Sequence, residues 1–176
     1  MTLINCTNNT TIFKDYGCSG NSLDSDIENV LDAKNNFSLD IPKHWKTELY
    51  FDSESSIFTT ADTTKQFNNT FLIKASLINA KLAINSVDIE KIKTNLETTK
   101  TLEIISTTEG SFKNMSAILL RSHVSSPLEK TILHLYAPLS KKQYFEIEVH
   151  CYGIEAVENR LCQAIQYVNS LKIAEL

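Results

Sequence analysis

The sequence predicts one α+β domain: a central antiparallel β-sheet of about six to eight strands, with helices packed on its faces and a long C-terminal helix that closes it. Two observations predict this class. Several runs between residues 37 and 151 alternate apolar and polar side chains, which is the period of a half-buried strand. After residue 153 the apolar period changes to that of an amphipathic helix. Because a one-sided helix must cover an apolar surface, we expect both patterns to share one core.

The chain of 176 residues is long enough for a single domain of ordinary size. We expect residues 1–35, which are rich in Asn, Ser, Asp and Thr, to be an N-terminal tether, and residues 36–176 to be the domain. Within the tether, Ser25 and Glu28 have the spacing of a capping box. Apolar residues follow at helical spacing, so the sequence predicts a short helix that ends near Leu31.

The body of the domain is predicted to contain up to eight strands and one internal helix. The strands are expected at residues 37–41, 47–51, 55–60, 69–77, 101–107, 112–123, 130–137 and 143–151. The internal helix is expected at residues 85–99, where Asn85 or Ser86 can cap it. Ile89, Ile92 and Leu96 recur on one side of this helix.

The last two strands form the clearest predicted hairpin. With the turn at residues 138–142, Leu133 and Leu135 are expected beside Ile147 and Phe145 on the apolar face. The same register predicts an outer face on which three residues of one strand oppose three of the other: Ile132, His134 and Tyr136 against Glu148, Glu146 and Tyr144. We predict that these six residues form either a surface for a protein partner or the seat of the internal helix.

The C-terminal helix is predicted to cover residues 154–173. Its apolar stripe consists of Val157, Leu161, Ala164, Ile165, Val168 and Leu171. Burial of five large aliphatic side chains contributes on the order of 10 kcal/mol, at about 2 kcal/mol each, before the ordering entropy is subtracted. This helix is therefore expected to hold the domain together.

The four cysteines give no metal-site pattern. None lies in a C-x-x-C pair, and no histidine lies at finger-like spacing from one. If Cys151 ends a strand and the helix begins near residue 153, Cys162 lies roughly 13 Å along the helix axis. A disulfide requires Cα atoms within about 7 Å of each other. We therefore interpret Cys151 and Cys162 as buried apolar side chains.

Cys6 has a different setting. It follows the short apolar segment Leu3-Ile4-Asn5 and precedes a polar stretch at residues 7–11, which resembles the lipidation junction of a bacterial lipoprotein. Asn5 is larger than the residue usual before such a cysteine, and no charged start or apolar h-region of a signal peptide is present. We predict that Cys6 is lipidated in the cell envelope. The alternative is a cytoplasmic protein with a frayed N-terminus, and a disulfide at Cys6 also remains open.

Composition and charge argue against several function classes. The formal net charge is −4, and Lys and Arg do not form long runs, so we expect no nucleic-acid binding. No stretch of 18 consecutive apolar residues is present, so the only membrane contact that we expect is through a lipid anchor.

The sequence contains no recognisable catalytic, cofactor or metal motif. The G-x-S-x-G turn of an elbow hydrolase and the H-E-x-x-H helix of a zinc protease are both absent. The predicted hairpin brings His134 near Glu146, Glu148 and His150, which allows a weak cation site or a pH-sensitive patch, or simply a solvated face with complementary charges. We therefore predict no catalytic residue, no metal and no cofactor, and a protein that is not an enzyme.

One further pair of residues is a candidate ligand rim. His44 and Trp45 follow the strand at residues 37–41, with Tyr50 and Phe51 downstream. The alternative is that Trp45 plugs the core, because a lone tryptophan just after a strand commonly does so.

The order of elements, together with the segment Phe37-Ser-Leu-Asp-Ile-Pro42-Lys-His-Trp45 at the start of the sheet, resembles the PsbP-like superfamily. This superfamily includes the extrinsic photosystem II subunit, a eukaryotic Ran-binding transport factor and bacterial lipoproteins. The resemblance covers residues 36–173 and implies a central antiparallel sheet and a role in binding or assembly. It carries over no functional residues, and we find no plant-type manganese or calcium motif, so a photosynthetic role is not implied.

These observations predict a non-enzymatic binding or assembly module of the bacterial cell envelope that binds a protein partner and is anchored through a lipid. The alternative function is an intracellular adaptor or immunity-like inhibitor that uses the same sheet against a protein partner.

Overall fold

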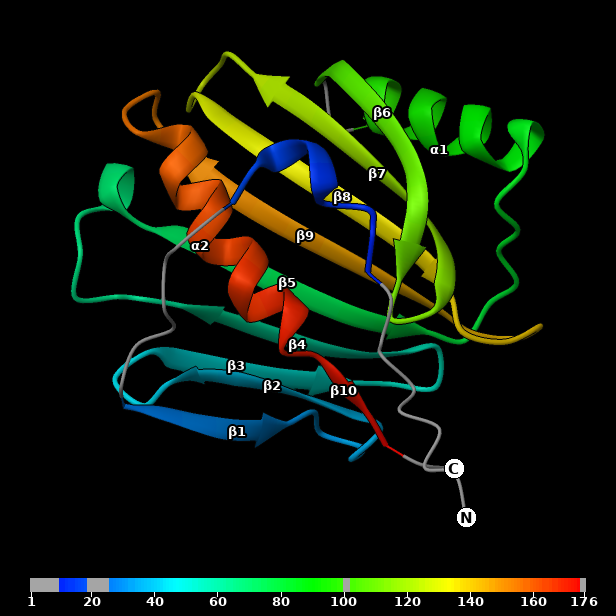
Figure 1. The fold of residues 1–176 in the computed structure, drawn as a ribbon, viewed down its shortest axis with the longest axis horizontal. Helices are drawn as coiled ribbons and strands as arrows, with labels where there is room; N and C mark the ends of the chain where they lie inside the picture. Colours follow the sequence, from blue (N-terminus) through cyan, green and yellow to red (C-terminus); the bar gives the residue numbers. More distant parts are fainter. Residues whose placement is uncertain (1–9, 19–25, 100–101, 175–176) are drawn as a thin grey trace.

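The computed structural model describes residues 10–18, 26–99 and 102–174. A seven-stranded sheet forms its centre, with strands in the order β3-β4-β5-β9-β8-β7-β6 (Figure 1). The strands are β3 (Lys46–Phe51), β4 (Ser55–Ala61), β5 (Phe71–Ile78), β6 (Glu103–Phe112), β7 (Met115–Val124), β8 (Lys130–Pro138) and β9 (Tyr144–Tyr152). Every neighbouring pair is antiparallel. The predicted α+β class with a central antiparallel sheet is confirmed.

A second, three-stranded sheet lies against the first. It consists of β1 (Ile27–Leu31), β2 (Phe37–Pro42) and β10 (Lys172–Ile173), in the order β1-β2-β10. The alternating apolar residues of β2, which are Phe37, Leu39 and Ile41, are at most 1% exposed. The Phe37 ring packs edge-on against Phe145 of β9, at 5.4 Å between ring centroids. The small sheet therefore buries the β2 side chains against the large sheet.

Helix α2 (Val157–Asn169) covers the same face of the large sheet as the small sheet does. This face, which we call the core face, carries Phe58, Ile73, Phe145 and Leu135. The stripe of α2 is buried as predicted: Leu161, Ala164, Ile165 and Val168 are at most 2% exposed. The helix is shorter than predicted at both ends: it begins at Val157 instead of residue 154, and after Asn169 the chain leaves it and pairs with β2 as β10.

Arg160 is a charged residue buried within this layer, although the sequence places it away from the apolar stripe. Its guanidinium donates to the main-chain oxygens of Thr70 at 2.9 Å, Tyr152 at 2.7 Å and Glu155 at 2.8 Å. These carbonyls lie where β5 begins, where β9 ends and just before α2. Arg160 therefore joins three elements through hydrogen bonds to their main-chain oxygens, which also satisfy its buried guanidinium.

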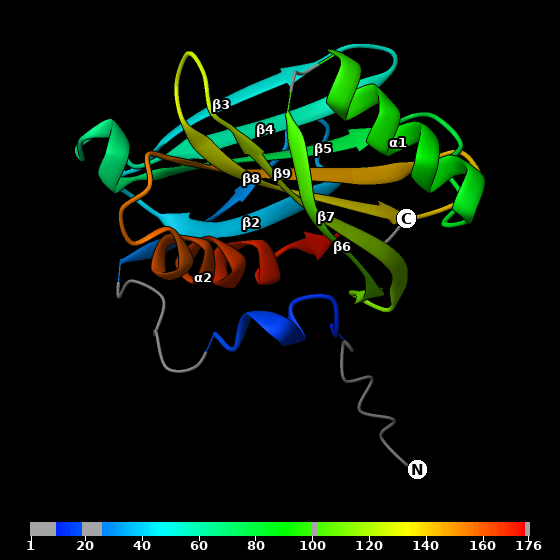
Figure 2. The same ribbon diagram turned by 90° about the horizontal axis from the view of Figure 1, so that it is seen from above.

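Helix α1 (Ser86–Thr99) lies on the opposite face of the sheet from α2 (Figure 2). The Asn85 side chain accepts a hydrogen bond from the backbone N–H of Asp88 at 2.9 Å, so Asn85 is the N-cap. Ile89 and Leu96 are buried in a second hydrophobic cluster with Leu120 and Ile132 of the sheet. The predicted helix and its apolar side are confirmed, and we call this face of the large sheet the α1 face.

The short helix predicted to end near Leu31 is wrong, because Ile27–Leu31 form strand β1. Asp32 explains the hairpin: its carboxylate accepts hydrogen bonds from the backbone N–H of Phe37 at 2.9 Å and from the Ser56 hydroxyl at 2.5 Å. On β1, the Asn29 side chain donates to Asp40 of β2 at 2.6 Å. A helical peptide of this length would lack such partners, so pairing with β2 is favoured. Residue 25, the start of the predicted capping box, lies outside the described residues.

The predicted register of the β8–β9 hairpin is wrong by two residues. The turn lies at residues 139–143, so Leu135 faces Ile147 and Leu133 faces Val149. Likewise His134 faces Glu148. A displacement of the turn by one residue changes every cross-strand partner by two positions, and side chains alternate with a period of two, so the assignment of residues to the two faces survives the error.

The described part of the predicted tether is folded against the domain. Ile12 is 1% exposed in the main core, and its backbone N–H donates to the main-chain oxygen of Ser111 at 3.1 Å. Gly110 permits this approach, since a Cβ atom there would lie 3.1 Å from the Ile12 Cα. Residues ahead of 36 therefore contribute to the fold, in β1 and in this segment.

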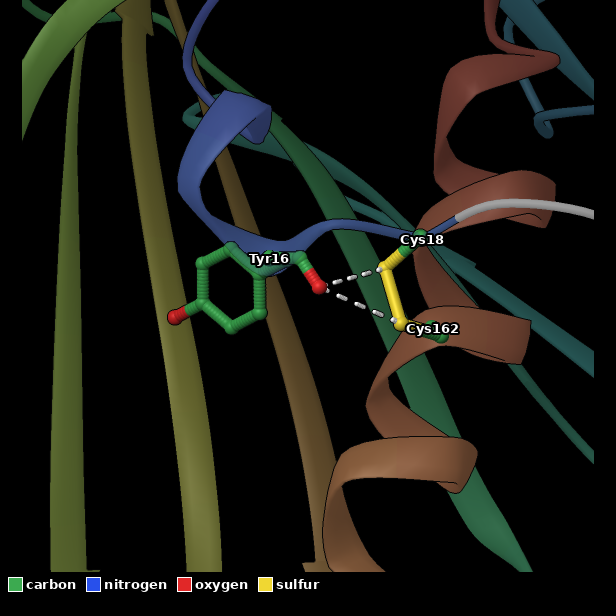
Figure 3. Close-up of a disulfide and its surroundings, with 3 residues drawn as sticks. All are labelled: Tyr16, Cys18 and Cys162. Atoms are coloured by element: carbon green, nitrogen blue, oxygen red, sulfur yellow. Dashed lines mark hydrogen bonds between the residues drawn. A yellow bond between two sulfur atoms is a disulfide. The ribbon is translucent and has the colours of Figure 1, made fainter.

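A disulfide fixes the same N-terminal segment to α2. After the single turn η1 (Lys14–Tyr16), Cys18 is bonded to Cys162, with Cα atoms 5.2 Å apart and a sequence separation of 144. The main-chain oxygen of Tyr16 lies 3.7 and 3.8 Å from the two sulfur atoms (Figure 3). The interpretation of Cys162 as an unpaired apolar side chain is wrong, because its partner comes from the opposite end of the chain. For Cys151, which is buried and free, the interpretation is confirmed.

Candidate functional site

The predicted outer face of β8 and β9 is largely covered by the protein itself. Ile132 is 2% exposed, His134 is fully buried and Tyr136 is 6% exposed. Ile132 and Tyr136 pack in the cluster that includes Ile89 and Leu96 of α1. Two alternatives were predicted for this face, a partner surface or the seat of the internal helix. At Ile132 and Tyr136 the internal helix packs on the face.

Tyr144 and Glu146 are the two predicted surface residues that remain half-exposed. The phenol of Tyr136 donates a hydrogen bond to the Glu146 carboxylate at 3.1 Å. Burial, with the Glu146 carboxylate beside it, raises the pKa of Tyr136 far above its usual value, so the phenol stays protonated and keeps donating. Glu146 is thereby fixed at the margin of the part that α1 covers.

Glu148, which is 3% exposed, is the centre of a buried polar network. One carboxylate oxygen lies 3.3 Å from Nδ1 of His134, and the other lies 3.5 Å from both Nε2 of His150 and Nζ of Lys74. Nε2 of His134 in turn lies 2.9 Å from the Ser122 hydroxyl. A buried carboxylate is costly unless cations and donors surround it, and here side chains of β5, β8 and β9 supply them.

The order serine, imidazole, carboxylate in this network resembles that of a hydrolase triad, but the geometry does not permit that chemistry. Ser122 and His134 are both fully buried, so no substrate carbonyl can approach the hydroxyl. A nucleophile has to face a cavity where the substrate and an oxyanion-stabilising donor can lie. The network therefore connects strands in the sheet interior.

The predicted cation site near His134, Glu148 and His150 does not take the form of a metal centre. Within the described ranges, no group of three or more His, Cys, Asp or Glu side chains is placed so that it could hold a metal ion. The Glu148 carboxylate is instead within 3.5 Å of the ammonium of Lys74.

The α1 face continues beyond the helix onto β3, β4 and β5, and we call this part the open half. Directly opposite residues of antiparallel strands share a face, so the pairing assigns its members: Lys46, Glu48, Tyr50, Ser55, Ile57, Thr59, Ala61, Leu72, Lys74, Ser76 and Ile78. Tyr50 is 57% exposed, and Ile57, Leu72 and Ile78 are half-buried. Tyr144 and Glu146 of β9 adjoin this surface, because they face Ile78 and Ser76.

The candidate rim of His44 and Trp45 separates into two roles. The Trp45 ring packs against Tyr167 at 4.8 Å and Phe71 at 5.3 Å between ring centroids, as the alternative of a core plug expects. His44 is about half exposed and lies 3.7 Å from the buried carboxylate of Asp62. The two side chains do not form a common rim.

Asp62 is held by its own turn. Burial would raise the pKa of its carboxyl, but hydrogen bonds from the Thr64 hydroxyl at 2.6 Å and the Thr64 backbone N–H at 3.0 Å outweigh it, with Lys65 at 3.3 Å. The net result is a pKa below the usual value. The carboxylate is thus ionised and used within the turn.

Two further predictions concern the membrane and the cell envelope. Cys6, the predicted lipidation site, lies outside the described residues. In the portion that the structure describes, neither helix is long and apolar enough to cross a membrane.

Comparison with known proteins gives structural matches only. No protein-family model and no curated protein matches the sequence. The structure is similar to cyanobacterial PsbP from Synechocystis sp. PCC 6803, with a TM-score of 0.57 and 10% identity over 88% of this chain and 96% of that one. The fold is PsbP-like.

The PsbP-like fold is also found in a second group of matches. The Ran-binding protein Mog1p of Saccharomyces cerevisiae has a TM-score of 0.56 and 9% identity, over 86% of this chain and 96% of that one. A point mutant of Mog1 has a TM-score of 0.58 and 8% identity, over 85% and 97%. The resemblance deduced from the order of elements is confirmed for the fold. At this identity the PsbP-like likeness establishes architecture and no function.

Sequence reasoning missed two features of the site. Lys74 lies on a correctly predicted strand, but its pairing with Glu148 depends on β5 and β9 being neighbours, and those strands are far apart in sequence. The open half was missed because α1 covers only the β6–β8 side, and strand periodicity does not indicate how far a helix reaches across a sheet. The alternation at residues 55–61, which leaves Ile57 half-buried, was the one available signal.

Proposed function

We propose that this chain is a non-enzymatic binding module of the cell envelope, anchored through a lipid on Cys6, which recognises a protein partner with the open half of its large sheet. The observation that carries the proposal is that α1 leaves β3, β4 and β5 uncovered on this face. The following paragraphs give the support for each part.

The open half has the composition of a protein-contact surface. Tyr50 projects from the edge strand, and Ile57, Leu72 and Ile78 supply half-buried aliphatic area beside it. Lys46 and Glu48 lie at the margin, where they form an ion pair at 2.7 Å. An apolar centre with an aromatic anchor and a charged rim is typical of such interfaces.

The disulfide supports the envelope location. A bond between Cys18 and Cys162 persists in an oxidising compartment, whereas cytosolic thiols are kept reduced. The bond also places the start of the domain against α2, so that a tether beginning at Cys6 would lead directly to the folded protein. The disulfide thus favours an oxidising location, and lipidation of Cys6 stays a prediction from the sequence alone.

The chemistry of the interior supports a binding role. Ser122 cannot reach a substrate, and burial raises the pKa of the Cys151 thiol to about 12, so the thiol is not a nucleophile at neutral pH. Ser122 and Cys151 are thus buried side chains that pack in the interior of the protein.

The partner surface is tested with matched exposed variants. Tyr50→Ser on the open half is compared with Val87→Ser on α1. The two side chains are similarly exposed, Tyr50 at 57% and Val87 at 61%, but Val87 lies on another surface. Each protein is crosslinked in native membranes and its partners are identified by mass spectrometry. We expect Tyr50→Ser, but not Val87→Ser, to lose a partner at least tenfold while both variants keep the wild-type thermal midpoint. Equal partner recovery in both variants would show that the open half is not the contact surface.

Location is tested separately. The protein expressed from its own gene in its native host should fractionate with membranes and carry an acyl mass on Cys6, and Cys6→Ser should release it. An unmodified Cys6 in a soluble cytosolic fraction would end the envelope part of the proposal and leave the partner surface untouched.

A further inference from the structure

One pocket on the α1 face combines buried apolar walls with polar side chains. It has a volume of about 600 Å³ and lies where β7 ends, β8 begins and the loop at residues 125–129 joins them. Pockets that hold small molecules are typically 300–1,000 Å³ and combine apolar walls with a few converging polar groups. We call it the β7–β8 pocket.

The walls of the β7–β8 pocket are apolar and come from separate elements. Leu102 precedes β6, Val124 ends β7 and Ile132 lies on β8, and all three side chains are at most 8% exposed. Leu128, which is 46% exposed, stands in the loop at the mouth. An apolar ligand body would replace water along walls that are already fixed by the fold, which favours binding without rearrangement.

Lys130 supplies a positive charge to this apolar pocket. Its ammonium makes no ion pair with a carboxylate of the described residues, and it lies over the Tyr152 ring, 5.7 Å from the centroid. The Ser126 hydroxyl lines the same pocket and adds a second donor. A cation without a counter-charge beside apolar walls is complementary to an amphipathic anion.

Glu148 and His150 also line the pocket, and the carboxylate does not cancel the charge of Lys130. Glu148 is already surrounded by Lys74 at 3.5 Å, His134 at 3.3 Å and His150 at 3.5 Å. The charges of Lys74 and Glu148 compensate each other, and Lys130 remains. The pocket is therefore lined by apolar side chains, with the charge of Glu148 compensated by Lys74 from outside the lining and the ammonium of Lys130 left for a ligand.

We propose that the β7–β8 pocket binds a small monocarboxylic acid with an aliphatic or aromatic body. The carboxylate of the ligand contacts Lys130 and Ser126, and its body packs against Leu102, Val124 and Ile132. This proposal is independent of the partner surface, because the pocket lies on the half of the face that α1 covers and the open half lies across β9.

The test uses the full chain and three ligands that share one apolar body. Decanoate, decanol and decylamine, each below its micellar concentration, are titrated by isothermal calorimetry and by two-dimensional NMR. We expect decanoate to bind one site and to shift the amides of residues 124–132, decanol to bind about tenfold more weakly, which equals about 1.4 kcal/mol, and decylamine more weakly still.

Variants separate the pocket from nonspecific binding. Lys130→Gln should weaken decanoate about tenfold and leave decanol unchanged, whereas Lys142→Gln, which removes an exposed charge from the β8–β9 turn, should bind both as the wild type does. Leu128→Ser, at the exposed mouth, should weaken the binding of every ligand without unfolding the protein, because it removes apolar contact and adds no charge. The proposal is overturned if decanoate does not bind, if decylamine binds as tightly, or if Lys130→Gln and Lys142→Gln behave alike.

Discussion

The two faces of the large sheet use the same strands for different purposes. On the core face, every inward side chain of β9 is buried, with Phe145, Ile147 and Val149 at most 3% exposed, beneath α2, the small sheet and the N-terminal segment. Only at the edge strand β3 does this face stay accessible among the described residues, with Leu49 46% and Phe51 57% exposed. On the α1 face, one helix covers only the β6–β8 side and leaves Tyr50 and Ile57 accessible. The difference suggests that the core face determines stability, which leaves the open half of the other face free for recognition.

The largest expected effect tests whether stability resides on the core face. Phe145→Ala removes a fully buried ring that contacts Phe37 and should lower the free energy of unfolding by about 3–5 kcal/mol. Tyr50→Ala, on the open half, should change it by less than about 0.5 kcal/mol. Urea titration followed by Trp45 fluorescence measures both, because the single tryptophan lies against Phe71 in the core. Similar losses for the two variants would contradict the assignment of stability to one face.

Removal of the disulfide tests how much of the stability of the core face depends on the covalent bond between the N-terminal segment and α2. Because the bond closes a loop between residues with a sequence separation of 144, the double substitution of Cys18 and Cys162 by Ser should cost about 2–5 kcal/mol of unfolding free energy. Dithiothreitol should produce the same loss in the wild type and no further loss in the double variant. If the wild type is insensitive to reductant, the N-terminal segment is held by Ile12 and its hydrogen bonds alone.

A smaller effect is expected from the helix on the α1 face. Leu96→Ala removes a buried side chain of α1 and should destabilise the protein by about 2–3 kcal/mol. Hydrogen exchange should show that the loss is local: amides of α1 exchange faster, and amides of α2 keep most of their protection. Equal acceleration in both helices would mean that the two faces unfold as one unit.

The smallest expected effect concerns acid. The lowered pKa of Asp62 means that its carboxylate stabilises the folded state above the usual carboxyl pKa, and that this contribution is lost as the pH falls through the folded-state value. Wild type should therefore lose more stability than Asp62→Asn between about pH 5 and about pH 2. Thermal melts at each pH measure this, with Asp26→Asn as an exposed control whose partner is Lys43. Parallel pH profiles would show that Asp62 is not linked to folding.

The alternation of apolar and polar residues in the sequence determined which side chains point to the core and which point away from it. The alternation in β8 and β9 and the stripe of α2 were sufficient for the α+β class and for the buried positions, because periodicity depends only on local backbone geometry. The order of these elements was also sufficient for the PsbP-like architecture. The predicted register of the β8–β9 hairpin was wrong, because the alternation of apolar and polar residues is satisfied equally well when the turn lies one residue further along the chain.

Only the tertiary structure decided which segments meet. The capping pattern near Glu28 favours a helix, but pairing with β2 and the carboxylate of Asp32 favour strand β1. Nothing local to Cys18 indicates Cys162 as its partner, since the two are brought together by the folding of the N-terminal segment onto α2. Whether a sheet face is covered, open or hollowed into a pocket depends on where a helix docks, and that is fixed by long-range packing which no single stretch of sequence encodes.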